Sequence, residues 1–79
     1  MKRKPRGLTL AEPAAYEICV SGELDGDWHD WFGDVTIERR YDDGRAETII
    51  TGTFDQTALH GVIRRIYSLG FPLISVKWV

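Results

Sequence analysis

The chain has 79 residues, a formal net charge of −2 and a hydrophobic content of 43%. This length provides one domain, with a core only just large enough to be stable. The single cysteine, Cys19, excludes an internal disulfide and predicts a reducing, cytoplasmic location. No apolar run approaches the length of a membrane span, so we expect no membrane partner.

The charges are unevenly distributed along the chain. Four cations lie within the first six residues, whereas residues 7–79 carry six cations and twelve anions. We therefore predict a flexible basic arm over residues 1–14 and a single domain over residues 15–79. The acidic domain would repel phosphate backbones, which argues against a nucleic-acid partner except through weak contacts of the arm.

The first predicted element is a half-buried strand over residues 16–24, in which apolar and polar side chains alternate. The next segment, residues 25–34, reads D-G-D-W-H-D-W-F-G-D. Its aromatic residues Trp28, Trp31 and Phe32 recur at helical spacing and predict a helix of roughly two turns. So short a helix is stable only when tertiary contacts hold it.

A β-hairpin is predicted next. Two strands, over residues 35–41 and 45–53, flank the turn sequence Asp42-Asp43-Gly44, in which the glycine can take positive φ. The alternation of apolar side chains assigns four residues of this region to the core: Val35, Ile37, Ile50 and Phe54.

An amphipathic helix and a buried strand complete the prediction. The helix covers residues 55–69, with Asp55 as N-cap and Gly70 as the stop. Its apolar stripe comprises Ala58, Leu59, Val62, Ile63, Ile66 and Leu69. The strand covers residues 73–79, directly after Pro72.

This order of elements predicts an α+β fold. A four-stranded antiparallel sheet with one long and one short helix on one face is the ferredoxin-like βαββαβ arrangement. About eleven residues connect the first two strands, which is the lower limit for a crossover between parallel strands. The alternative is therefore a three-strand meander followed by a helix and a strand.

The titratable residues do not form a recognisable catalytic or metal site. The D-x-D opening of residues 25–34 resembles a calcium loop, but Asp30 stands where that loop needs glycine and Thr36 where it needs glutamate. His60 is expected on the polar side of its helix beside Arg64, and no nucleophile is placed next to it. We predict no catalytic residue, metal ligand or cofactor.

Gly61 is unusual, because a glycine inside a helix costs about 1 kcal/mol relative to alanine. We expect it to permit the close approach of the short aromatic helix or of a second subunit. Trp28 and Trp31 alternate with aspartates, which favours core packing or protein contact over base stacking. The candidate interaction residues are therefore Trp28, Trp31, Phe32, His60, Gly61 and Arg64.

Four blocks of the chain resemble a family of small bacterial proteins of uncharacterised function. They are Y-E-I-C-V-S-G-E-L, W-H-D-W-F-G-D-V-T-I, T-G-T-F-D-Q-T-A-L-H-G-V-I-R-R-I and L-G-F-P-L-I-S-V. The most specific patterns are W-x-x-W-F and D-Q-x-A-L-H-G, and the resemblance covers about residues 16–76. It supports the fold and the domain boundaries and implies no activity.

A second, local resemblance concerns the long helix and the strand after it. Seven residues are similar to those of regulatory ACT domains: Asp55, Leu59, Ile66, Leu69, Gly70, Ser75 and Val76. ACT domains are βαββαβ modules that bind amino acids at subunit interfaces, and in them this helix is the first of two. The resemblance implies a ligand site at the start of the helix, near residues 55–57.

Two functions follow as hypotheses. The first is a non-enzymatic interaction module that forms a homodimer or small homo-oligomer, or binds another protein. It is motivated by the marginal core and by a sheet face that mixes Cys19, Ile49 and Leu73 with polar residues. The second is a small-ligand sensor that receives an anion at the amides of residues 55–57. An enzymatic role is not expected, because acidic residues follow Leu24 where a phosphate-binding loop would be basic.

Overall fold

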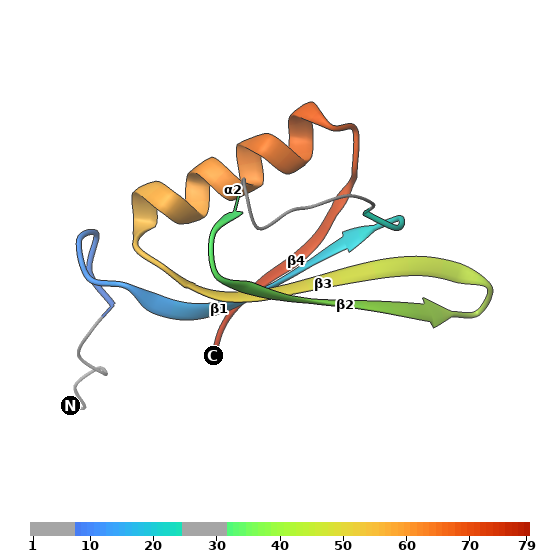
Figure 1. Ribbon diagram of the computed structural model, residues 1–79, viewed down its shortest axis with the longest axis horizontal. Coiled ribbons are helices and arrows are strands. Elements are labelled where there is room, and N and C mark those ends of the chain that lie inside the picture. The colour runs from blue at the N-terminus through green and yellow to red at the C-terminus, as the bar shows by residue number, and fades with distance from the viewer. Residues whose placement is uncertain (1–7, 25–31) are drawn as a thin grey trace.

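The structure is a computed structural model that describes residues 8–24 and 32–79. One helix lies across one face of a sheet (Figure 1). The elements are β1 (Ala14–Ser21), β2 (Val35–Asp42), β3 (Arg45–Phe54), α2 (Gln56–Ser68) and β4 (Leu73–Trp78).

The four strands form one antiparallel sheet with the order β2-β3-β1-β4. β3 and β4 are each antiparallel to the central strand β1, so they run parallel to one another and α2 connects them. The alternative of a three-strand meander is wrong, because β1 pairs with β3 instead of β2.

The prediction of an α+β fold with a four-stranded antiparallel sheet is confirmed. The two-helix ferredoxin-like arrangement is not supported, because α2 is the one complete helix among the described residues, and Phe32 alone represents the short segment in helical conformation. Most of the predicted short helix, including Trp28 and Trp31, lies outside the described residues. The described end of that segment, Phe32, is 7% exposed and belongs to the core.

β1 covers Ala14–Ser21, so it starts two residues earlier than predicted and ends three residues earlier, at Ser21 instead of Leu24. The chain turns at Gly22, whose φ of 109° is readily adopted only by glycine. Its backbone N–H donates to the carbonyl of Ala46 at 2.8 Å. Leu24 lies beyond this turn and is completely buried, so the residues after the strand still contribute to the core.

The hairpin is confirmed, with a turn at Asp43 and Gly44. Both residues have positive φ, 55° and 81°, as in the two-residue turns that match the twist of antiparallel strands. Asp42 is opposite Arg45 across the turn. The local sequence therefore determines the register of β2 on β3.

The long helix is confirmed with its caps, but its buried stripe is narrower than predicted. The carboxylate of Asp55 accepts a hydrogen bond from the N–H of Ala58 at 2.8 Å, and Gly70 follows the helix with a φ of 88°. Ala58 and Leu69 are exposed. The helical residues that are fully buried are Leu59, Val62 and Ile66.

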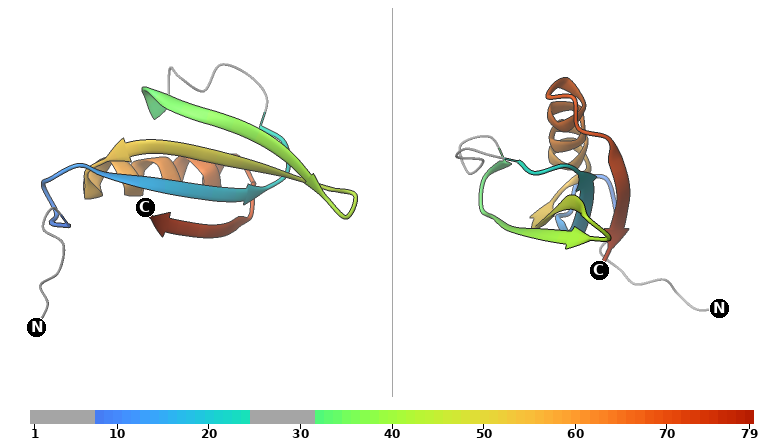
Figure 2. Two further views of the ribbon diagram at one scale, coloured as in Figure 1. Left: turned by 90° about the horizontal axis from the view of Figure 1, so that it is seen from below. Right: turned by 90° about the vertical axis from the view of Figure 1, so that its right-hand side faces the viewer.

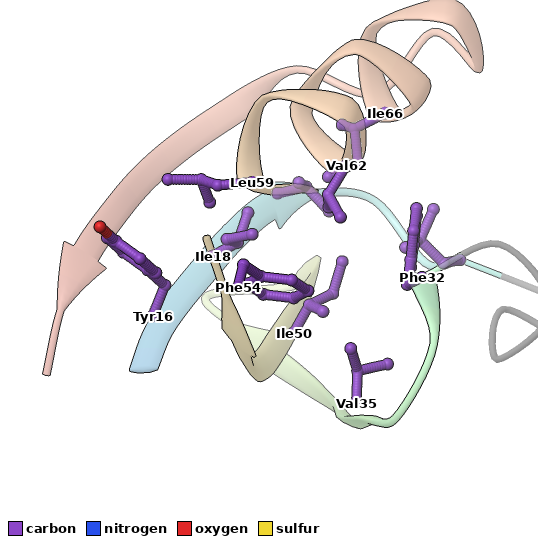
Figure 3. Close-up of a cluster of buried hydrophobic side chains, with 11 residues drawn as sticks. Tyr16, Ile18, Phe32, Val35, Ile50, Phe54, Leu59, Val62 and Ile66 are labelled. Carbon is purple, nitrogen blue, oxygen red and sulfur yellow. The ribbon is translucent and has the colours of Figure 1, made fainter. Parts of the chain in front are cut away.

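The core lies between α2 and the sheet (Figure 3). Three of the four predicted hairpin core residues, Val35, Ile50 and Phe54, are buried, whereas Ile37 on the edge strand β2 is half-buried. The remaining members come from β1, α2 and the connections: Tyr16, Ile18, Val20, Leu24, Phe32, Leu59, Val62 and Ile66.

Candidate functional site

The most exposed apolar region of the described sheet is β4. This strand was predicted to be buried, but it is an edge strand that pairs with β1 alone among the described strands (Figure 2). We call its unpaired side the β4 edge. The exposed apolar residues in and directly after it are Leu73 (44%), Ile74 (50%), Val76 (36%), Trp78 (42%) and Val79 (65%).

The opposite edge of the sheet, β2, has a different character. It presents charged residues at four of its eight positions: Glu38, Arg39, Arg40 and Asp42. Charged side chains on an edge strand discourage pairing with other chains. β4 has only one charged residue, Lys77, and its ammonium lies 3.5 Å from the carboxylate of Glu17 on β1. The β4 edge therefore carries less charge than β2.

The predicted mixed face on the other side of the sheet is not an open apolar surface. Ile49 does face away from α2, yet it is only 5% exposed. Its neighbours in the adjacent strands are Cys19 and Glu38. Leu73 does not belong to this face, because it pairs with the core residue Val20 at a β-bulge. The apolar surface of the domain is thus at the edge of the sheet.

A second feature, a groove on the outer side of α2, brings three predicted site residues together. His60, Gly61 and Arg64 line a groove of about 540 Å³ together with Leu10, Gln56 and Thr57. The expected close approach to Gly61 is not seen among the described residues, because nothing lies within 4 Å of a Cβ built there. Phe32 lies in the core and is not a lining residue of the groove.

The start of α2 offers few free amides to a ligand. The N–H of Gln56 donates to the carbonyl of Leu10 at 3.2 Å. The N–H of Ala58 donates to the carboxylate of Asp55. These partners occupy two of the helix's first three amides. They also place a negative charge where an anionic ligand would bind.

Cys19 is half-buried and its Sγ lies 3.7 Å from Oε1 of Glu47. Burial raises the pKa of the thiol, and the Glu47 carboxylate raises it further by its charge and by accepting the S–H hydrogen bond. The sulfur therefore keeps its proton at neutral pH. Within residues 8–24 and 32–79, no three histidine, cysteine, aspartate or glutamate side chains are grouped so that they could hold a metal ion.

Sequence reasoning missed the β4 edge because it assigned that strand to the interior. One signal was available. Ser75 and Lys77 alternate with Ile74, Val76 and Trp78, a pattern more typical of a strand exposed on one side than of a buried one.

None of the described helices is long and apolar enough to cross a membrane.

Residues 15–77 match the protein family described as "Domain of unknown function (DUF8691)". The match agrees with the resemblance to an uncharacterised family and spans nearly the same residues. No curated protein and no solved structure matches the chain significantly.

Proposed function

We propose that this chain, which belongs to the DUF8691 family of domains of unknown function, is a non-enzymatic module that associates with itself. The observation that carries the proposal is the β4 edge, where apolar side chains lie beside backbone that no other described strand pairs with. In the monomer, water must solvate the apolar side chains and the backbone groups of this edge. A dimer buries these side chains and pairs the backbone groups with a second strand. In so small a domain, this burial also adds to a marginal core.

The titratable residues support a non-enzymatic role. Nucleophilic catalysis by cysteine requires the thiolate, whereas the raised pKa of Cys19 keeps its thiol protonated. His60 is exposed in the groove on α2, where solvent surrounds it.

A second candidate function is that of a small-ligand regulatory domain similar to ACT domains. It is supported by the groove on α2, whose lining includes His60 and Arg64 and would favour an anion. The occupied amides at the start of α2 argue against it. Self-association is therefore the better-supported function.

Sedimentation equilibrium of the full chain, from low to high micromolar concentration, tests the proposal. We expect a reversible monomer–dimer equilibrium. Val76→Lys should weaken the dimer by at least tenfold, because it places a charge on the β4 edge. The matched control is Tyr67→Lys, since Tyr67 is also apolar and is 82% exposed, but lies on α2. It should leave the equilibrium unchanged.

Three outcomes would contradict the proposal. The first is a parent chain that is monomeric at every concentration, and the second is a Val76→Lys variant that dimerises as the parent does. The third is a melting temperature that rises with an amino acid or nucleotide and not with protein concentration. The last result would favour the ligand-binding function, and Arg64→Ala should then abolish the effect of the ligand.

A further inference from the structure

We infer that two copies of the chain join through β4 itself, in antiparallel register about a two-fold axis at Val76. This inference rests on the proposed function and specifies its geometry. The two four-stranded sheets would become one continuous sheet. Three features of β4 support this inference. They are the direction of the free backbone groups of β4, the apolar side chains that the register brings together, and the like charges that the register keeps apart.

The free backbone groups belong to Val76 and Trp78. The N–H of Val79 donates to the carbonyl of Ala15 at 3.0 Å, so Val79 faces β1. Successive residues of a strand direct their N–H and C=O groups to opposite sides. Lys77, which is opposite Glu17, therefore also bonds toward β1. Val76 and Trp78 direct their N–H and C=O groups away from the sheet, where a second strand can accept and donate.

A two-fold axis at Val76 pairs the free backbone groups of β4 with the same strand of the second copy. Val76 would exchange both of its backbone hydrogen bonds with Val76 of the second copy. Side chains directly opposite one another share a face of the sheet. Val76 is opposite the core residue Ile18 on β1, so it lies on the face covered by α2. Both α2 helices would therefore lie on the same face of the combined sheet.

The same register brings apolar residues together and separates like charges. Trp78 comes to lie opposite Ile74 of the second copy, next to the β-bulge at the start of β4, and these side chains are 42% and 50% exposed in the monomer. Lys77 comes to lie opposite Ser75, while its ammonium keeps its contact with Glu17. An axis at Lys77 would instead place two ammonium groups opposite one another, which is unfavourable. The charge of Lys77 thus disfavours an axis at Lys77 and is compatible with one at Val76.

Amide hydrogen exchange on the unmodified protein tests this geometry directly. In the monomer the Val76 amide points away from β1 and no described strand pairs with it, so its exchange should slow at least tenfold between a dilute and a concentrated sample. The Lys77 amide is already bonded to β1 and should change much less. Equal exchange of Val76 at both concentrations, in a sample that sedimentation shows to be dimeric, would overturn the inference and leave the proposed function standing.

Proline substitutions supply a second test. Val76→Pro removes an N–H that points away from β1 and that no described strand pairs with, so the chain should stay folded by circular dichroism while dimerisation weakens at least tenfold. Lys77→Pro removes an N–H bonded to β1 and should destabilise the monomer itself. A folded Val76→Pro variant that dimerises like the parent would overturn the inference. If the parent is monomeric throughout, the inference and the proposed function fail together.

Discussion

Thr48 and Leu24 lie side by side without exposed surface, and the Thr48 hydroxyl accepts a hydrogen bond from the backbone N–H of Leu24 at 3.2 Å. The same hydroxyl donates to the carbonyl of Gly22 at 2.7 Å. The guanidinium of Arg39 donates to the carbonyl of Leu24. Side chains of β3 and β2 thus satisfy the backbone where the chain leaves β1. This arrangement determines the direction in which the connection to β2 begins.

Thr48→Val should therefore destabilise the fold, although valine has nearly the shape of threonine. It leaves the carbonyl of Gly22 and the N–H of Leu24 without their hydroxyl partner, and a buried unsatisfied group costs about 1–3 kcal/mol. In a domain of this size, each kcal/mol lowers the melting temperature by about 4–8 °C. Thermal unfolding followed by circular dichroism measures the effect.

Thr51→Val is the matched control for that substitution. Thr51 lies on the same strand but is exposed, so its change should stay within about 0.5 kcal/mol. A Thr48→Val protein as stable as the parent would mean that the bridge to Leu24 contributes nothing.

Gly61→Ala should stabilise the protein by about 1 kcal/mol. Alanine favours the helix, and no described atom lies within 4 Å of the added methyl group. Gly52→Ala provides the contrast, because its methyl group would lie 2.8 Å from Cζ of Phe54 and 2.9 Å from Cγ1 of Val35. We expect that variant to lose stability through overpacking. Urea unfolding of both proteins tests the pair, and a destabilised Gly61→Ala would show that some other group packs there.

Gly22→Ala should cost more stability than Gly44→Ala. Both glycines have positive φ, 109° and 81°, so alanine is strained at each. At Gly22 the new methyl group would also lie 2.8 Å from the ring of Phe71, whereas no described atom lies within 4 Å of a Cβ built at Gly44. The difference between their melting temperatures therefore measures the contact with Phe71. Equal losses would mean that the ring moves aside without cost.

The stability of the protein should fall as the pH rises above about 8.5, the ordinary pKa of a thiol. The pKa of Cys19 is raised in the folded state by burial and by Glu47, so the unfolded chain loses its proton first. Below that range both states are protonated. Above it, stability decreases until the folded thiol also ionises. Urea midpoints between neutral and alkaline pH measure the decrease.

Cys19→Ala should remove this component of the pH dependence, and Glu47→Gln should reduce it. Glu47→Gln should also shift the alkylation of Cys19 by iodoacetamide to lower pH, since the negative charge that opposes ionisation is gone. An unchanged alkylation profile would show that Glu47 does not influence the thiol.

The local elements of this protein can be read from its sequence. Asp43 and Gly44 specify the hairpin turn, and Asp55 and Gly70 specify the ends of α2, because each acts on backbone only a few residues away. The alternation of apolar residues in β1 and β3 likewise identified the buried side of the sheet. The same kind of reasoning correctly placed His60 and Arg64 on one exposed side of the helix.

The order of the strands was decided by tertiary structure. β1 lies between β3 and β4, so β4 becomes an edge, and Val76 and Trp78 are exposed although they are opposite the core residues Ile18 and Tyr16 of β1. The burial of Leu24 beyond the end of β1 also depends on Thr48, which is distant in sequence. Periodicity reports which side chains share a face, whereas the partner on each side of a strand depends on non-local pairing.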